Sequence, residues 1–283
     1  MILLSFDTEE FDLPREHGVN YPIEEGMKIS IDGTNRVLDI LKRTRAKATF
    51  FCTGNFAKRA PEVMKRIVDE GHEVACHGVD HWRPKPTDVQ ESKRILEKIT
   101  GQKVYGYRQP RMFSVDNGDL VTTEYLYNSS INPAFIPGRY MHLATPRTPF
   151  VKEGVLQIPA SVTPFVRFPL FWLSFRNLPE SLYFSMVRQV LKHDGLFVTY
   201  SHPWEFHNLE QYPELKIPYI VRHNSGDVVS NRLERFIRTF KKQGEKFGTY
   251  TEYAKTKVQP RKRKKIKLTE KFTSKFTNKK RKS

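Results

Sequence analysis

The amino-acid sequence predicts an α/β domain built on a parallel β-sheet and followed by a basic tail. Short apolar runs alternate with amphipathic helical stretches along the first 254 residues, and acidic, histidine or arginine residues follow several of these runs. Such alternation indicates βαβ units, whose parallel strands end at one common edge of the sheet. A chain of 283 residues is long enough to bury one core of this kind.

The first half of the chain contains four short apolar runs of strand character. These expected strands cover residues 2–6, 48–53, 72–76 and 104–107. Between them, apolar residues recur at helical spacing, which predicts helices over 34–44, 61–71 and 88–101. Pro61 suits a first helical turn, and Gly71 and Gly101 stand where a helix end is expected.

The second half is less regular. Residues 133–179 are rich in proline, and only 155–158 has strand character there, so the rest of this segment is expected to form surface loops that shape a substrate groove. Residues 182–191 and 229–243 are expected to be helices, with a strand over 195–200 between them. The pattern contains no internal repeat, and the domain is expected to end near Ala254.

The charge of +17 is concentrated at the end of the chain. Residues 255–283 hold 14 lysines and arginines against Glu270 alone, so this tail carries +13 and the first 254 residues about +4. Such a segment cannot bury a core and is expected to be disordered. Three interpretations stay open for it: an anionic membrane surface, simple solvation, or, with less support, nucleic acid.

The sequence favours a cytoplasmic protein, peripheral to the membrane if the tail binds lipid. No stretch approaches the roughly 20 apolar residues of a membrane span, and residues 1–7 lack the basic start of a signal peptide. The two cysteines, Cys52 and Cys76, lie in apolar runs and are expected to be reduced and buried.

His77 and His81 are four residues apart and follow an expected strand. If they lay on one helical turn, both imidazoles would face the same way and could share a divalent metal ion. This spacing also arises between unrelated histidines. The metal interpretation gains weight because Asp7 and Glu9, Arg108, and His202 also follow strands, at the edge where α/β barrels build their active sites.

These residue types together fit metal-assisted hydrolysis. Two histidines and a carboxylate leave a coordination position free for water. A second carboxylate could accept the proton of that water, a further histidine could protonate a leaving amine, and Arg108 could hold the base in place. The alternatives are a solvated acidic turn at residues 7–10, a structural ion pair at Arg108 and an ordinary loop histidine at His202.

Six stretches carry a resemblance to a known family. They are residues 5–9, 48–51, 71–81, 107–110, 127–130 and 202–205. In this order, the chain resembles the NodB-homology polysaccharide deacetylases (carbohydrate esterase family 4), in the branch with Asp-x-Glu and His-Pro-Trp-Glu motifs. The resemblance covers residues 2–254, the expected deacetylase barrel domain, and excludes the tail at 255–283.

The resemblance implies a distorted (β/α)7 barrel that removes N-acetyl groups from an amino sugar, in a polysaccharide or a lipid-linked saccharide. It implies a divalent metal, Zn²⁺ first, with Co²⁺, Ni²⁺ or Fe²⁺ as alternatives. By position, Asp7 matches the catalytic base, His77 and His81 the metal histidines, Arg108 the arginine that braces the base, and His202 the general acid.

Two positions depart from the family pattern. Thr8 stands where the metal aspartate often lies, so Glu9 is the expected third ligand, with Glu10 and Asp12 as substitutes. Glu9 shares a strand face with Asp7 and can therefore point to the same site. Asn128 stands where relatives usually have aspartate, which leaves a substrate contact or a structural role open.

Substrate contacts are expected from Trp82, Pro110, Asn128 and Trp204, although core packing is an alternative for each tryptophan. Two further functions compete with glycan deacetylation. One is an amidohydrolase or deformylase acting on another amide, which the same site would serve. The other is an inactive barrel that binds glycan.

Overall fold

The computed structural model describes residues 1–136, 140–141 and 143–258. The predicted basic tail therefore lies outside the described residues from position 259 onward. Helix α11 (Tyr250–Lys257) continues three residues beyond the expected end of the domain, and Ala254 within it is fully buried.

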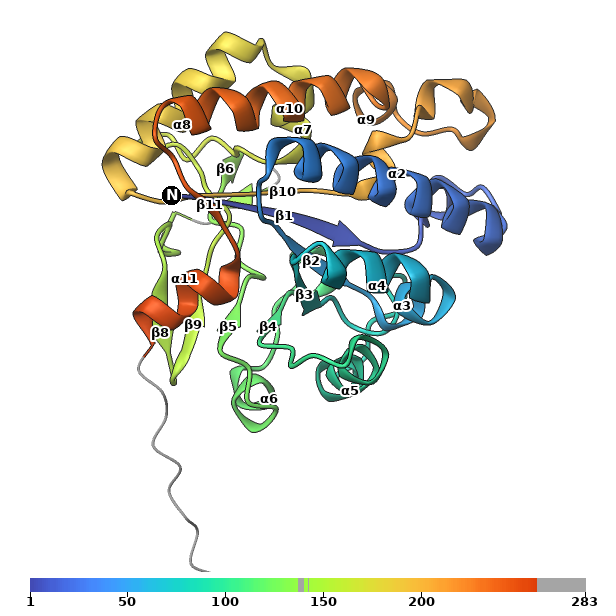
Figure 1. Cartoon of the computed structure of the whole chain (residues 1–283), viewed down its shortest axis with the longest axis horizontal. Coiled ribbons are helices and arrows are strands. Elements are labelled where there is room, and N and C mark those ends of the chain that lie inside the picture. The colour runs from blue at the N-terminus through green and yellow to red at the C-terminus, as the bar shows by residue number, and fades with distance from the viewer. Residues whose placement is uncertain (137–139, 142, 259–283) are drawn as a thin grey trace, which may run out of the picture.

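The described residues form one curled nine-stranded sheet (Figure 1). Seven strands are parallel neighbours in the order β10-β1-β2-β3-β4-β5-β9, β8 pairs antiparallel with β9 at one edge, and β11 pairs with β1. This curled and largely parallel sheet, in which β11 is an eighth parallel strand, confirms the predicted distorted barrel. The strands are β1 (Ile2–Thr8), β2 (Thr49–Cys52), β3 (Glu73–Cys76), β4 (Gly106–Tyr107), β5 (Tyr127–Asn128), β8 (Phe150–Lys152), β9 (Val155–Gln157), β10 (Phe197–Ser201) and β11 (Phe247–Gly248).

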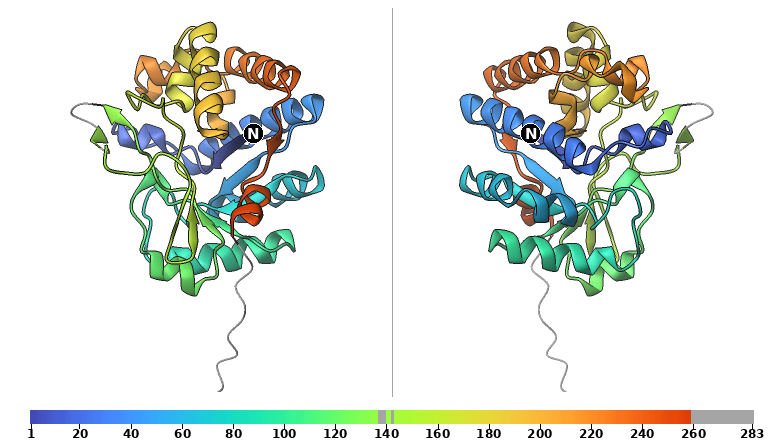
Figure 2. Two further views of the ribbon diagram at one scale, coloured as in Figure 1. Left: turned by 90° about the vertical axis from the view of Figure 1, so that its left-hand side faces the viewer. Right: turned by 90° about the vertical axis from the view of Figure 1, so that its right-hand side faces the viewer.

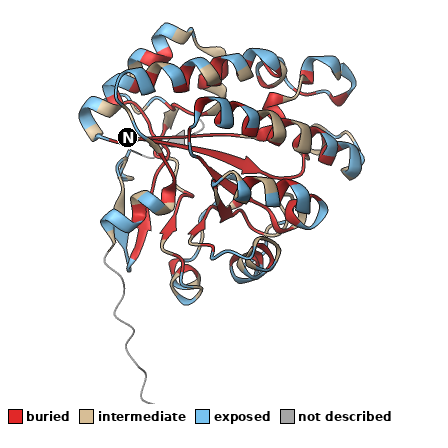
Figure 3. Cartoon of the chain, viewed as in Figure 1, coloured by how far each residue is buried: buried red, intermediate tan, exposed pale blue. Residues whose placement is uncertain are grey.

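Helices surround the outer face of this sheet, as the two side views in Figure 2 show. Figure 3 shows buried strands inside and exposed outer faces on the helices. The helices are α1 (Leu13–Glu16), α2 (Ile23–Thr44), α3 (Gly54–Arg59), α4 (Pro61–Asp69), α5 (Asp88–Thr100), α6 (Asn117–Thr122), α7 (Trp172–Asn177), α8 (Glu180–Asp194), α9 (Tyr219–Arg222), α10 (Asp227–Lys242) and α11. Four 3-10 turns, η1 (Pro110–Met112), η2 (Pro203–Phe206), η3 (Leu209–Gln211) and η4 (Pro213–Leu215), and the small hairpin of β6 (Phe135–Ile136) and β7 (Tyr140–Met141) complete the order.

Alternation along β1 explains how the sheet serves both a core and a site. Ile2, Leu4 and Phe6 face outward into the large core beneath the helices, whereas Leu3 faces a second apolar cluster inside the barrel. Asp7 is on the same face as Leu3, because successive side chains of a strand alternate between faces. The inner face of β1 therefore changes from apolar to acidic toward its carboxyl end.

Helix α2 begins at Ile23, eleven residues before the start predicted from the periodicity. The prediction missed the first half because it contains two glycines, which usually weaken helices. Here they permit close contact. A β-carbon on Gly26 would lie 2.6 Å from the carbonyl oxygen of Phe11, and one on Gly33 would lie 1.9 Å from that of Pro203.

The helical turn considered for His77 and His81 does not form, because residues 77–87 contain no helix and both histidines lie on an irregular loop after β3. The described part of the proline-rich segment 133–179 is largely irregular, as expected, with β9 at the expected strand. It also contains β8, helix α7 and buried side chains such as Val162 and Leu170, which were not expected. Its short strands carry little periodicity, which is why the pattern concealed them. None of the helices in the described ranges has the length and apolar character that a bilayer span requires.

Candidate active site

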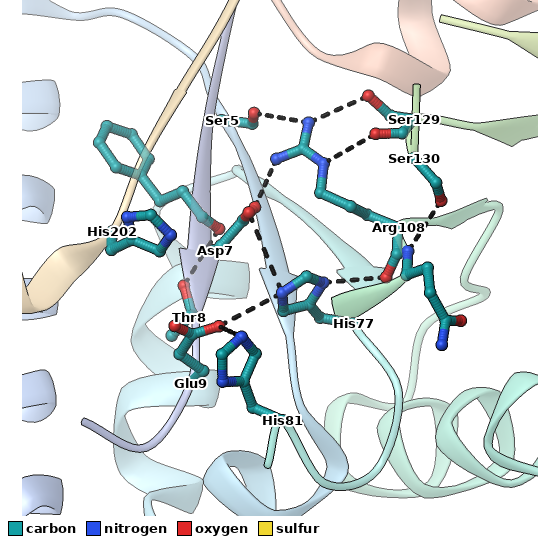
Figure 4. Close-up of polar contacts among 12 residues, drawn as sticks. Ser5, Asp7, Thr8, Glu9, His77, His81, Arg108, Ser129, Ser130 and His202 are labelled. Carbon is teal, nitrogen blue, oxygen red and sulfur yellow. Dashed lines mark hydrogen bonds and ion pairs between the residues drawn. The ribbon is translucent and has the colours of Figure 1, made fainter. Parts of the chain in front are cut away.

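Glu9, His77 and His81 converge at the carboxyl ends of β1 and β3 (Figure 4). Oε2 of Glu9 lies 3.3 Å from Nε2 of His77 and 3.2 Å from Nε2 of His81. Ligand atoms about 2.0–2.1 Å from a tetrahedral zinc ion stand roughly 3.3 Å apart, so these two separations match a zinc coordination shell. The histidine pair meets here although it is not helical, with ring centroids 5.8 Å apart.

The other nitrogen of each histidine is held by a neighbour. Nδ1 of His77 donates to the carbonyl oxygen of Arg108 at 2.9 Å, and Nδ1 of His81 donates to the carboxylate of Asp12 at 3.0 Å. Because each Nδ1 carries the donated hydrogen, each neutral ring presents an unprotonated Nε2 to Glu9. Such outer partners orient metal-binding histidines in general.

The structure distinguishes among the three carboxylates that follow β1. Glu10 accepts a hydrogen bond from the Thr53 hydroxyl at 2.8 Å, and Asp12 is the partner of His81. Glu9 alone faces both histidines. Its Oε2 is buried and has no hydrogen-bond partner among the described residues, as expected for an oxygen arranged to meet a cation. The donor set therefore fits a divalent ion.

The charges of this cluster reinforce one another. Burial by itself would raise the pKa of the Glu9 carboxyl, but the charge of His81 and the adjacent ring of His77 outweigh it and lower this pKa to about 2. Burial by itself would lower the pKa of His81, but Glu9 and Asp12 raise it to about 9. A metal ion would displace a proton from His81 on binding.

Asp7 lies beside the cluster and is held by a buried arginine. One carboxylate oxygen of Asp7 pairs with Nη1 of Arg108, and the other, Oδ2, lies 3.9 Å from Nε2 of His77. Arg108 is fully buried. Its remaining donors bond to Ser129, Ser5 and Tyr250 at 3.0–3.1 Å.

Aromatic rings enclose the same guanidinium, which lies 3.9 Å from the centre of the Phe51 ring. Burial by itself would lower the pKa of Arg108, but the charge of Asp7 outweighs it and raises this pKa further. A guanidinium with a hydrogen-bond partner on every nitrogen has one favoured position. Asp7 is therefore held in one orientation, with Oδ2 on the side of the cluster.

His202 follows β10 and faces the site from the opposite side. Its ring stacks on Trp204, with centroids 4.7 Å apart, and its Nδ1 lies 3.1 Å from a carboxylate oxygen of Glu205. Burial by itself would lower the pKa of His202, but the hydrogen bond to Glu205 and the charge of Glu9 outweigh it and raise this pKa. A histidine in this setting favours its protonated form, as a proton donor requires.

These side chains line one cavity of about 310 Å³. Asp7, Glu9, His77, His81 and His202 all contribute to its wall. The remaining wall is largely aromatic and comes from Phe113, Trp172, Tyr200 and Trp204. The cavity therefore combines a polar, charged end with flat apolar surfaces.

The four expected substrate contacts differ in position. Trp204 lines the cavity, and its Nε1 donates to Glu9 at 3.4 Å. Trp82 lies beside a neighbouring depression, with the Arg111 guanidinium 5.1 Å from its ring centre. Pro110 and Asn128 are buried and absent from the described cavity wall. Asn128 instead donates to Gln157 at 2.8 Å and accepts from Ser130.

Sequence reasoning missed several residues of this region. Trp172 and Arg176 lie in the proline-rich segment that was expected to be loop. Tyr200 lies in an expected strand, but the sequence did not indicate which face of the sheet its side chain occupies. Asp12 was considered only as a substitute metal ligand. Glu205 was visible in the motif at 202–205, yet no role was derived for it.

The fold and the site together define an α/β barrel whose carboxyl-terminal edge carries a His–His–Glu cluster, a braced aspartate and a further histidine. A family model described as polysaccharide deacetylase matches residues 24–121. This match confirms the predicted resemblance: over these residues the chain is similar to the polysaccharide deacetylases.

Curated relatives agree over short segments. A peptidoglycan-N-acetylmuramic acid deacetylase of Bacillus subtilis is 48% identical over 84 residues, which are 27% of this chain and 32% of that protein. A chitooligosaccharide deacetylase of Sinorhizobium fredii is 48% identical over 98 residues, 32% of this chain and 45% of that protein. The chain spans less than half the length of the curated relatives it matches.

The fold agrees over nearly the whole domain. A crystal structure from Mycobacterium smegmatis, assigned as a polysaccharide deacetylase, superposes with a TM-score of 0.63 and covers 92% of this chain and 91% of that chain. The two sequences are only 18% identical. This likeness supports the barrel and not a particular activity.

Proposed function

We propose that the protein is a zinc-dependent hydrolase that removes N-acetyl groups from an amino sugar in a glycan or a lipid-linked saccharide. The observation that carries this proposal is the cluster of Glu9, His77 and His81, whose ligand atoms lie within 4.8 Å of one another beside Asp7 and His202. The similarity to named deacetylases supports the acetamide as the scissile group.

Glu9, His77 and His81 would hold the metal ion. When bound, zinc activates water as a nucleophile and polarises an amide carbonyl. Asp12 and the carbonyl of Arg108 hold the two histidines in the orientation and tautomer that binding requires.

Asp7 is the general base of the proposed reaction. Arg108 occupies one of its oxygens and leaves Oδ2 beside the cluster, where it accepts the proton of the attacking water. Because the guanidinium is bonded on all sides, the carboxylate does not rotate away between turnovers. Arg108 itself touches no substrate.

His202 is the general acid on the opposite wall. Its Nε2 gives a proton to the amine nitrogen as the C–N bond breaks, so that acetate and a free amino sugar leave as products. The aromatic wall of Phe113, Trp172 and Trp204 offers flat surfaces that suit the apolar faces of sugar rings. The Asp-x-Glu and His-Pro-Trp-Glu segments place these groups at opposite sides of one cavity.

The test measures acetate release and bound metal together. Purified protein is screened on N-acetylhexosamine glycans and oligosaccharides, with matched N-formyl substrates and small non-sugar amides as alternatives. Removal of the metal by a chelator is expected to abolish acetate release, and zinc or cobalt to restore it. Activity that persists after confirmed metal loss would contradict the mechanism.

A further inference from the structure

A second buried arginine lies behind His202. Arg176, on α7, has no exposed side-chain surface, and its Nε lies 3.2 Å from Oε2 of Glu205, which is equally buried. Its Nη2 donates to the carbonyl oxygen of Val221 at 2.5 Å. Among the described residues, Glu205 is the one acid that pairs with it. Burial lowers the pKa of Arg176, which shows how poorly this position suits an isolated cation.

Glu205 divides its two oxygens between Arg176 and His202. Oε2 faces Arg176, whereas Oε1 accepts from the backbone N–H of His202 at 2.7 Å and from its Nδ1 at 3.1 Å. A carboxylate can only accept here, so the hydrogen of that contact is on Nδ1. The lone pair or proton available for chemistry is then at Nε2.

The ring of His202 is also held on its faces and edges. Trp204 stacks on it at an interplanar angle of 18°, and Trp172 meets it edge-on, with centroids 5.1 Å apart. The Arg176 guanidinium lies 5.7 Å from the centre of the same Trp172 ring. These contacts oppose the ring flip that would exchange the positions of the two nitrogens.

A purely structural role for the Arg176–Glu205 pair is the competing interpretation. Buried ion pairs contribute little net stability, and well-packed apolar residues of similar size often replace them without loss. Apolar residues could therefore join α7 to η2 equally well. They could not keep the hydrogen of His202 on Nδ1, which requires a buried acceptor. Arg108 and Asp7 show the same design on the other side of the cavity.

We propose that Glu205 and Arg176 are positioning residues for His202: Glu205 keeps a hydrogen on Nδ1, and Arg176 holds the other carboxylate oxygen of Glu205 in place. This inference rests on the proposed function of His202 as the acid. The imidazolium carries hydrogens on both nitrogens and transfers the one on Nε2 to the leaving amine. The neutral product is the Nδ1–H tautomer, which is the form that Glu205 stabilises.

The variants separate this role from folding. Glu205→Gln removes the charge at nearly constant shape. Because this change leaves Arg176 without its counter-ion, the double variant Arg176→Met, Glu205→Leu removes both partners together. Arg232→Met is the matched control: Arg232 is also buried next to α7, but it donates to the carbonyls of Leu178 and Arg176 and forms no ion pair within the described residues.

Two readouts are measured on the zinc-loaded full chain. We expect both Glu205 variants to lose about 10²-fold in kcat, with KM within about 3-fold of wild type and bound zinc unchanged. The basic limb of the kcat–pH profile is expected to move to lower pH. In ¹⁵N-histidine spectra, assigned by comparison with His202→Ala, neutral His202 should be the Nδ1–H tautomer in wild type and a mixture in the double variant.

The control Arg232→Met is expected to change thermal stability alone. Near-normal kcat with an unchanged pH profile in both Glu205 variants would mean that the Arg176–Glu205 pair has only a structural role, and it would overturn the proposal. An Nε2–H tautomer in wild type would overturn it as well. If wild type releases no acetate from any substrate while the spectra show the expected change, the positioning role stands and the proposed function fails.

Discussion

Replacement of Arg108 by methionine tests whether the buried Asp7–Arg108 pair organises the site. The change keeps an unbranched apolar stem but removes the guanidinium, and it leaves the charge of Asp7, which is 3% exposed, without its partner. It also removes the donors to Ser5, Ser129 and Tyr250. We expect a folded but strongly destabilised protein with no measurable turnover.

The magnitude follows from the burial. Removing one partner of a buried ion pair costs about 3–5 kcal/mol, because the remaining charge stays desolvated. For a chain of this size, 1 kcal/mol corresponds to roughly 2 °C in melting temperature. Arg108→Met is therefore expected to melt about 6–10 °C below wild type, measured by circular dichroism on zinc-loaded protein.

Two comparisons complete this experiment. The double variant Asp7→Asn, Arg108→Met should recover a large part of the lost stability, because no unpaired charge remains. Arg235→Met breaks the exposed pair with Glu180 and should cost less than about 1 kcal/mol. The reasoning is refuted if Arg108→Met melts within about 1 °C of wild type, or if the double variant is no more stable than the single one.

Three further predictions concern metal, acid and pH. Glu9→Gln should abolish zinc binding in a competition titration, and Asp12→Asn should weaken it about 10–100-fold. If Asp12→Asn binds zinc as tightly as wild type, Asp12 does not support the metal site. His202→Ala should lose about 10²-fold or more in kcat while retaining zinc, and near-normal turnover would refute its acid role. Burial lowers the pKa of His72 from 6.5 to about 4, so the unfolded chain binds a proton there first as the pH falls. Wild type should accordingly lose roughly 3 kcal/mol more than His72→Phe in unfolding free energy between pH 7 and pH 4, and parallel denaturation curves for the two would contradict this.

The strands and most helices were predictable because their signals are local. The runs at β1, β2 and β3 are apolar, continuous and bounded by polar residues, and left-handed Gly101 and Gly195 end α5 and α8. Only the second half of helix α2 was predicted. Glycine is needed at position 33 because the helix contacts η2 there, some 170 residues later in the chain. A pattern read along the chain carries no information about such a neighbour.

The candidate site divides in the same way. The sequence by itself determined which residue types stand at the strand ends, because alternating strands and helices direct those ends to one edge: Asp7, His77, Arg108 and His202 followed from that rule. The sequence also favoured Glu9 as the third ligand, through the family resemblance and the strand face that it shares with Asp7. The positions of Glu10 beside Thr53 and of Asp12 beside His81 were visible only in the folded chain.

The pairing of Arg176 with Glu205 was likewise decided only by the tertiary structure, since their contact joins α7 to η2 across 28 intervening positions. A candidate metal site could be predicted from residue types, because those types limit what a site can bind. The orientation of the site side chains could not be predicted, because a hydrogen bond to Nδ1 or a buried counter-ion exists only when distant segments pack together.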